Sequence, residues 1–224
     1  MKLARPDVFH PRIVLAGSPQ HPRGRREDAG LVAALRARGL HARWLSWDDS
    51  ATGSADLVIL RAAEGPAERR EEFLGWTRTV ANLLNPPAAI AWNLNDRYLG
   101  DIEDAGVPTQ PDEPAQTALI FLGGRQSHAF TESGSAEPEF DIWDVGHAAL
   151  AAAAECVGIA ASELLQARVD VNGDRLVSLD LIAPSLGWRR LDADVRGLAQ
   201  RDFALAVESA LHRLGLGPLS HRRP

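Results

Sequence analysis

Two short segments near the C-terminal end of the chain combine residue types that could bind an anion and a cation together. The first is Arg168-Val169-Asp170-Val171, and the second is Ser178-Leu179-Asp180. Side chains alternate across a β-strand, so Arg168 and Asp170 share one face of the first segment. The Asn172-Gly173 pair between the segments is a strong hairpin signal and would lay the two strands side by side.

Carboxylates from adjacent strands are suited to Mg²⁺, which takes oxygen ligands and keeps several waters or substrate phosphates. We therefore predict Asp170 and Asp180 as metal ligands. Arg168 could steer an anion into the same place, and we take Arg168 and Asp170 as candidate catalytic residues. From spacing alone, a solvent-facing polar row on a half-buried hairpin remains an alternative, as does an ion pair of Arg168 with either aspartate.

The elements around this site are predicted to be antiparallel strands covered by helices. Residues 117–122 and 126–131 flank Gly123-Gly124-Arg125, which is typical of a tight hairpin. This hairpin would bring Arg125 and His128 close to the candidate site. Apolar spacing predicts helices at residues 145–157 and 194–214, and a polar loop at residues 132–139.

The first half of the chain alternates strands and helices. Strands are predicted at residues 12–16, 41–45, 57–60 and 89–92, and helices at residues 28–38, 68–84 and 97–105. This order predicts an α/β domain with a mostly parallel sheet. A proline-rich stretch at residues 108–116 reads either as a linker between domains 1–110 and 117–224 or as a surface loop.

Composition excludes several classes of function. A net charge of −6 argues against non-specific nucleic-acid binding, which needs a basic face. No apolar run reaches the ~18 residues of a membrane span, and the start of the chain lacks a signal-peptide core. We expect a cytoplasmic protein that binds neither nucleic acid nor membrane and that could form a homo-oligomer. Its small-molecule or protein partner stays open.

Long ordered segments resemble ATP-grasp proteins of the glutathione-synthetase-like type, and more narrowly actinobacterial members. Residues 117–130 (TALIFLGGRQSHAF), 140–171 and 179–192 (LDLIAPSLGWRRLD) resemble the C-terminal part of those proteins. Residues 11–17, 41–49, 56–62, 82–93 and 97–109 resemble the preceding domain. The resemblance implies a Rossmann-like pre-ATP-grasp domain at residues 1–110 and an α+β ATP-grasp remnant with antiparallel strands at residues 117–224.

The same resemblance implies an ATP-dependent carboxylate–amine ligase that uses Mg²⁺ and ATP to form an acyl phosphate. Asp170 matches one metal ligand of the family, and we add Arg125, His128 and Ser185 as candidate cofactor-binding residues. Ser178-Leu179-Asp180 stands where the family has Glu-x-Glu or Glu-x-Asn.

Other departures concern ATP itself. The central ATP-binding subdomain of the family would fall between residues 111 and 117, where a handful of polar residues stands instead. Glu132 and Asp96 occupy positions where the family has basic residues, and the only lysine is Lys2. We therefore predict a shortened ATP-grasp-like protein, impaired as a ligase, with a binding or regulatory role. The alternatives are an active Mg-ATP-dependent ligase and a structural or interaction module without a ligand.

Overall fold

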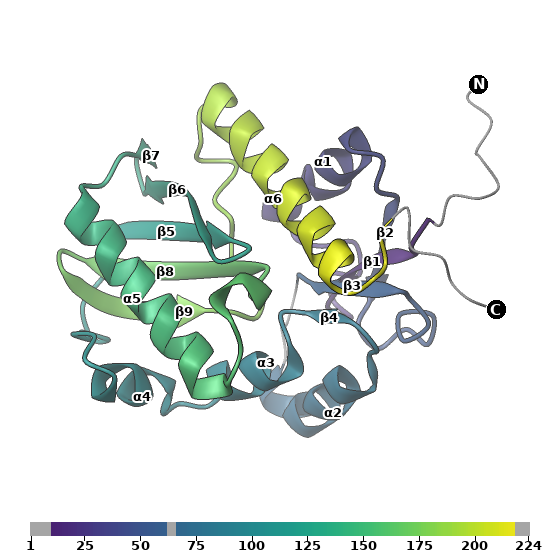
Figure 1. Ribbon diagram of the computed structural model, residues 1–224, viewed down its shortest axis with the longest axis horizontal. Coiled ribbons are helices and arrows are strands. Elements are labelled where there is room, and N and C mark those ends of the chain that lie inside the picture. Colours follow the sequence, from purple (N-terminus) through teal and green to yellow (C-terminus); the bar gives the residue numbers. More distant parts are fainter. Residues whose placement is uncertain (1–9, 62–65, 218–224) are drawn as a thin grey trace.

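The chain folds around two β-sheets, as a computed structural model that describes residues 10–61 and 66–217 shows (Figure 1). The first sheet is parallel and has the strand order β2-β1-β3-β4. Its strands are β1 (Ile13–Gly17), β2 (Ala42–Ser46), β3 (Leu57–Leu60) and β4 (Leu83–Leu84).

The second sheet is antiparallel and has the order β7-β6-β5-β8-β9. Its strands are β5 (Thr117–Leu122), β6 (Arg125–Thr131), β7 (Gly134–Ala136), β8 (Gln166–Asn172) and β9 (Arg175–Asp180). The predicted fold class, a parallel α/β half followed by an antiparallel half with helices, is therefore confirmed.

Six α-helices and two short 3₁₀ turns cover these sheets within the described ranges. The helices are α1 (Leu31–Ala37), α2 (Pro66–Thr79), α3 (Pro87–Asn93), α4 (Tyr98–Asp104), α5 (Phe140–Val157) and α6 (Ala193–Arg213). The 3₁₀ turns are η1 (Arg26–Asp28) and η2 (Ala161–Glu163). None of the helices in residues 10–61 and 66–217 has the length and apolar character needed to cross a lipid bilayer.

Strand alternation divides the core into three layers. In β1, Ile13 and Leu15 point into a layer shared with α1, α6 and the strands β5 and β6. Val14 and Ala16 point the opposite way and pack with α2. Because successive side chains of a strand face opposite sides, each sheet must be covered on both faces. The odd-numbered residues of β5, Leu119 and Phe121, face α5 in the third layer.

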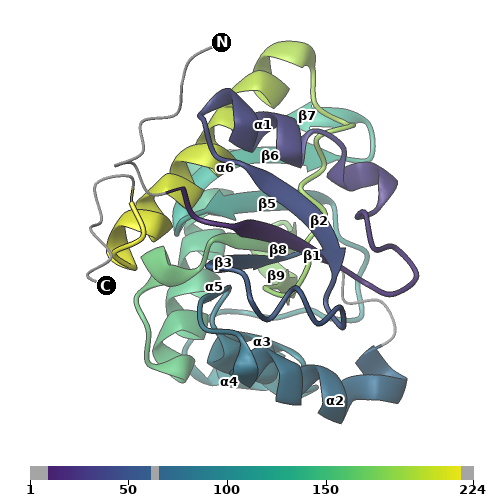
Figure 2. The ribbon, with the colours of Figure 1, turned by 90° about the vertical axis from the view of Figure 1, so that its right-hand side faces the viewer.

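The two halves of the chain interleave. Helix α6, from the end of the sequence, lies between the two sheets and beside α1 (Figure 1). Helices α3 and α4, from the first half, contribute Ala89 and Ile102 to the core under the antiparallel sheet. Figure 2 shows the parallel sheet in front of the antiparallel one, with α1 and α2 at opposite ends of the view. The division into residues 1–110 and 117–224 stays a prediction.

The proline-rich stretch at residues 108–116 follows the edge of the β8–β9 hairpin. Backbone hydrogen bonds fix both of its ends: Leu176 N donates to Pro108 O at 2.9 Å, and Gln116 N donates to Val171 O at 2.9 Å. This short segment connects α4 directly to β5. The described residues therefore contain no further sheet between the parallel and the antiparallel one.

Several predicted elements were wrong. Residues 89–92 are part of helix α3, because Pro87 stands at the first helical turn, where its missing N–H costs nothing. The helix predicted for residues 68–84 ends at Thr79, and its last two leucines form β4 against β3. A short apolar run fits either a buried helix or a buried strand, which explains both errors. The loop predicted at residues 132–139 contains β7.

Candidate functional site

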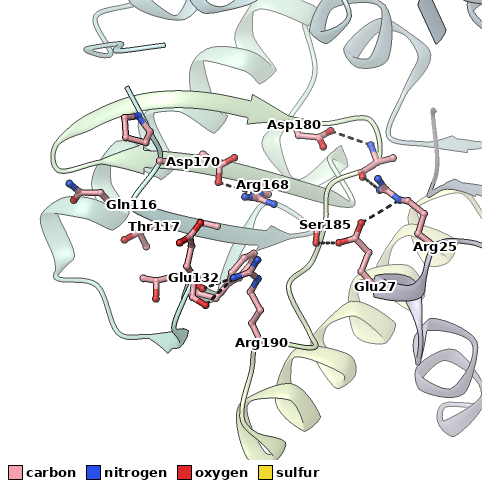
Figure 3. A pocket seen from close by; sticks show the side chains of 16 residues that line it. Arg25, Glu27, Gln116, Thr117, Glu132, Arg168, Asp170, Asp180, Ser185 and Arg190 are labelled. Atoms are coloured by element: carbon pink, nitrogen blue, oxygen red, sulfur yellow. Dashed lines mark hydrogen bonds and ion pairs between the residues drawn. The ribbon is translucent and has the colours of Figure 1, made fainter. Parts of the chain in front are cut away.

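A polar cavity of about 610 Å³ lies over the antiparallel sheet, where the loop after β9 approaches η1 (Figure 3). Strands β5, β6, β8 and β9 form one wall, and the segments 25–27 and 183–190 form the other. The charged residues that line it are Arg25, Glu27, Glu132, Arg168, Asp170, Asp180 and Arg190. The polar row predicted on the hairpin thus faces a cavity.

Arg168 and Asp170 form an ion pair on the floor of this cavity. Asp180 is the direct cross-strand neighbour of Arg168, and Ser178 is the neighbour of Asp170. Arg168 Nε donates to Asp170 Oδ1 at 2.8 Å, and Ser178 Oγ donates to Asp170 Oδ2 at 3.0 Å. Both carboxylate oxygens of Asp170 are therefore engaged by protein donors. The guanidinium of Arg168 also lies 5.3 Å from the ring centre of Phe130.

Asp180 closes the turn that follows β9. Its Oδ1 accepts hydrogen bonds from the backbone N–H groups of Ile182, at 2.9 Å, and Ala183, at 3.2 Å. A carboxylate that accepts backbone N–H groups in this way holds a loop in one conformation. The carbonyl of Ala183 in turn accepts a hydrogen bond from Arg25 Nη2 at 2.9 Å. Asp180 therefore helps to set the wall of the cavity.

The opposite wall is held by contacts between segments far apart in the sequence. Ser185 Oγ donates to Glu27 Oε2 at 2.6 Å, and Arg25 pairs with Glu27 at 3.4 Å. Arg190 Nη1 donates to the backbone carbonyl of Glu132 at 3.0 Å. Figure 3 shows Arg168 and Asp170 on the strands, with Arg25, Glu27 and Ser185 to their right and Glu132 and Arg190 below them.

A buried polar network fixes η1 beneath this wall. Arg61 and Asp28 are almost fully buried, and Arg61 Nη2 donates to Asp28 Oδ1 at 2.6 Å. Arg61 also donates to Gln166 Oε1 on β8, at 2.6 Å, and to Pro184 O, at 2.9 Å. One guanidinium thus ties the end of β3 to η1, to the antiparallel sheet and to the loop after β9.

The structure gathers four of the six predicted site residues in the cavity, and places the other two elsewhere. Arg168, Asp170, Asp180 and Ser185 line the cavity together. Arg125 lines a separate cavity of about 330 Å³ beside α6. His128 is 5% exposed, and its ring bonds within the protein. The roles of all six residues stay predictions.

Sequence reasoning did not assign Arg25, Glu27 or Arg190 to the site. Glu27 and Ser185 are 158 residues apart in the chain, so no spacing signal could have paired them. The Arg25-Arg26 run reads as solvated surface in the sequence, because nothing local shows that η1 folds onto the loop after β9. Arg190 lies within the segment 179–192 that resembles the family, and this was the only available hint.

Burial and the hydrogen bonds of His128 favour a neutral imidazole. Its Nε2 lies 2.8 Å from the carbonyl of Leu186, so Nε2 carries the proton. Its Nδ1 lies 3.0 Å from Ser127 Oγ and accepts that hydroxyl. Burial lowers the pKa of His128, although the Leu186 carbonyl and the charge of Asp202 act in the opposite direction.

This pKa shift predicts a loss of stability in mild acid. Below pH ~6.5 the unfolded chain takes up a proton at this imidazole that the folded chain resists, so the free energy of unfolding falls as the pH falls. The slope for one such group is at most about 1.4 kcal/mol per pH unit. Urea denaturation of the wild type at several pH values from about 7.5 to 5.5 measures it.

His128→Gln removes the titrating ring and should flatten this pH dependence. His212→Gln is the matched control, because His212 is an exposed histidine on α6. We expect the control to keep the wild-type slope. Equal slopes in all three proteins would contradict the assignment.

The site can be compared with what a Mg-ATP complex would need. Among the residues described, no cluster of three or more His, Cys, Asp or Glu side chains could hold a metal ion. The cavity lining within that part of the chain contains no lysine, and Lys2 lies outside the described residues. The residues present therefore do not fit magnesium together with a triphosphate.

Part of the sequence is similar to known proteins. Residues 13–85 match the family model of the N-terminal domain of D-cycloserine synthetase DcsG. The cycloserine biosynthesis protein DcsG of Streptomyces lavendulae is 30% identical over 114 residues, which are 49% of this chain and 36% of that protein. The match thus spans about a third of the length of this relative.

The fold is shared with ATP-grasp enzymes of known structure. The crystal structure of D-cycloserine synthetase DcsG aligns with a TM-score of 0.70 and 20% identity, over 87% of this chain and 98% of that one. The ATP-grasp ligase PsnB, in complex with a precursor variant, Mg and ADP, aligns with a TM-score of 0.57 and 14% identity, over 89% and 99% of the two chains. The macrocyclase MdnC from Microcystis aeruginosa MRC, bound to its precursor peptide MdnA, gives a TM-score of 0.57 and 10% identity over 88% and 99%.

The predicted resemblance is therefore confirmed at the level of the fold: the chain shares its fold with ATP-grasp proteins, and its residues 13–85 match the N-terminal domain of DcsG.

Proposed function

We propose that this chain is a shortened ATP-grasp protein that binds a small zwitterionic molecule in the cavity over its antiparallel sheet and does not itself catalyse an ATP-dependent ligation. The proposal rests on two features: a cavity lined by four of the predicted site residues, and the absence from the sequence of the segments that hold ATP in the family that the chain resembles. It covers the cavity that Arg168, Asp170, Asp180 and Ser185 line.

The observation that carries the proposal is the state of Asp170. Its two oxygens accept hydrogen bonds from Arg168 Nε and Ser178 Oγ, at 2.8 and 3.0 Å. A cation would have to displace a guanidinium at the same carboxylate, and two like charges at one site repel each other. The side chains of Arg168 and Asp170 are only 28% and 14% exposed, so water screens this repulsion incompletely.

The charges of the lining favour a zwitterion over a polyanion. Three arginines and four carboxylates surround the cavity, so the lining carries a net charge of 3 − 4 = −1. That balance opposes ATP, whereas an amino acid presents one group of each sign. An arginine can hold the carboxylate of such a ligand through two parallel hydrogen bonds, and a carboxylate of the wall can accept its ammonium.

The second candidate is an active Mg-ATP-dependent ligase. It is favoured by the gathering of Arg168, Asp170, Asp180 and Ser185 in one cavity, and by structural neighbours such as PsnB, which was crystallised with Mg and ADP. Under this alternative, Mg²⁺ would replace Arg168 at Asp170 when nucleotide binds. The two candidates make opposite predictions for the effect of Mg-ATP.

Thermal unfolding in the presence of ligands separates the candidates. We expect neither Mg²⁺ nor Mg-ATP to cause a rise in the melting temperature of the wild type that depends on Asp170. A ligand that binds the native state at a hundredfold excess over its Kd stabilises it by about 2.7 kcal/mol, so real binding is readily detected. A panel of D- and L-amino acids at about 10 mM, enough to detect a Kd of ~0.1 mM, provides the zwitterionic probes.

Asp170→Asn is the diagnostic variant, and Asp174→Asn is its control. Asp174 lies exposed in the turn of the same hairpin, so it gives the same charge change away from the cavity. We expect Asp170→Asn to lower the free energy of unfolding by about 1–2 kcal/mol, because its ion pair is broken, and to do so equally with and without Mg²⁺. It should also lose the response to the amino acid that stabilises the wild type, and Asp174→Asn should keep it.

Three outcomes would change the conclusion. A Mg-ATP-dependent rise in melting temperature that disappears in Asp170→Asn supports the active ligase. The absence of any response to the amino acids contradicts the zwitterion site, and supports a structural module. A response that persists in Asp170→Asn places the ligand outside this cavity.

A further inference from the structure

A second cavity, of about 460 Å³, is lined partly by η1 and by the loop after β9, and its charged residues are all basic. Its side chains come from η1, from the start of α1, from the loop after β9 and from the first turns of α6. The residues that line it are Arg26, Ala29, Gly30, Trp188, Arg189, Arg196 and Gln200. Three arginines and no carboxylate thus line this cavity, in a chain whose net charge is −6.

Two adjacent arginine pairs divide their side chains between the two cavities. Arg25 and Arg190 line the cavity over the antiparallel sheet, where they contact Glu27 and the Glu132 carbonyl. Arg26 and Arg189, their neighbours in the chain, line the second cavity. The contacts of the first pair fix the backbone at both places and thereby position the second pair.

In the part of the chain that the structure describes, the charges of the three arginines of the second cavity meet no protein partner. Within residues 10–61 and 66–217, no ion pair or side-chain hydrogen bond involves Arg26, Arg189 or Arg196. Asp192 and Asp194 stand near the start of α6 but do not line this cavity. Like charges that converge without a counter-charge repel each other, and a bound anion would remove this repulsion.

The rest of the lining is ordered enough to form a site. Trp188 is 1% exposed and packs edge-on against Phe203 of α6, with ring centres 5.9 Å apart. Arg196 and Gln200 are four residues apart on α6, so they lie on the same side of the helix. Gly30 has a φ of +104°, and a Cβ there would lie 2.7 Å from Gln200 Nε2. The glycine thus leaves room for the amide of Gln200 beside the three guanidiniums.

We propose that this basic cavity is a binding site for a phosphate group. Guanidinium groups match phosphate oxygens with two parallel hydrogen bonds, and three of them suit an anion of two or more charges. The volume of about 460 Å³ leaves space for a small organic body that carries the phosphate. This site is separate from the cavity of the proposed function and does not depend on it.

The test measures the binding of pyrophosphate to the full chain by calorimetry, in buffer without magnesium. We expect saturable binding that weakens as sodium chloride is raised, because salt screens the attraction. The double variant Arg189→Gln/Arg196→Gln should bind about tenfold or more weakly, since each lost hydrogen bond involves a charged group. The single variant Arg26→Gln should show a smaller loss, and it provides an independent result if the double variant does not fold.

Arg36→Gln/Arg201→Gln is the matched control. It removes two positive charges from exposed positions on α1 and α6 that do not line this cavity. We expect its affinity for pyrophosphate to stay within about twofold of the wild type, as for screened surface charges. An equal weakening in the control would show that only net charge matters and would overturn the proposal. So would an absence of saturable binding to the wild type. Inorganic phosphate and ATP, titrated in the same way, distinguish a free anion from a phosphate carried on a larger body.

Discussion

Arg61→Met is expected to lower the free energy of unfolding by about 3–5 kcal/mol, because it leaves Asp28 buried and charged without its partner. Arg61 and Asp28 side chains are each 1% exposed, and their ion pair measures 2.6 Å. The same guanidinium satisfies Gln166 Oε1 and Pro184 O. For a chain of this size the loss corresponds to a fall in melting temperature of about 6–20 °C.

The double variant Arg61→Met/Asp28→Asn tests the physical reason. A neutral asparagine can still accept the Arg25 backbone N–H, which donates to Asp28 Oδ2 at 2.8 Å. It no longer carries an unpaired charge, and replacing both members of a buried pair is much less costly than removing one. Chemical denaturation should therefore place the double variant above Arg61→Met in stability. If the double variant is the less stable of the two, the loss comes from packing and from the other hydrogen bonds of Arg61.

Gly187→Ala is the second change with a large expected effect, because it should lower the free energy of unfolding by about 2–5 kcal/mol. The residue has a φ of +65°, where an L side chain costs about 1–2 kcal/mol. A Cβ at this position would lie 2.1 Å from Cε1 of the Phe130 ring, so that ring must move. Overpacking of this kind adds typically about 1–3 kcal/mol.

Gly158→Ala separates the backbone cost from the clash. Gly158 has a φ of +70° at the end of α5, and a Cβ there meets nothing within 4 Å. Urea denaturation should show that this control loses about 1–2 kcal/mol of the free energy of unfolding and that Gly187→Ala loses clearly more. Because Phe130 lines the cavity beneath Arg168, Gly187→Ala should also weaken any amino-acid response of the wild type. Equal losses in the two variants would mean that the Phe130 ring moves aside at no cost.

The sequence alone determined much of the fold. Short continuous apolar runs predicted β1 and β3, and glycine-containing turns predicted the β5–β6 and β8–β9 hairpins, because apolar runs and turn chemistry are local properties. They also placed Arg168, Asp170 and Asp180 on one face, as the cross-strand register of β8 and β9 confirms. The resemblance to ATP-grasp proteins came from long ordered segments and agrees with the structural comparisons.

Local pattern failed where an apolar run was short. The apolar runs 83–84 and 89–92 are two and four residues long, and hydrophobicity alone cannot assign such short runs to helix or strand. At these two places the tertiary contacts decide the secondary structure: α3 packs against the antiparallel sheet, and β4 pairs with β3.

Only the tertiary structure decided how the site is closed. It brought η1 against the loop after β9, so that Glu27 meets Ser185 across 158 residues, and it turned His128 into the core. It also left Arg26, Arg189 and Arg196 together without a carboxylate. These arrangements arise because the two sheets share one core and because buried Arg61 hydrogen-bonds across both halves of the chain. Contacts between residues so distant in the chain cannot be detected from residue spacing or hydrophobic periodicity.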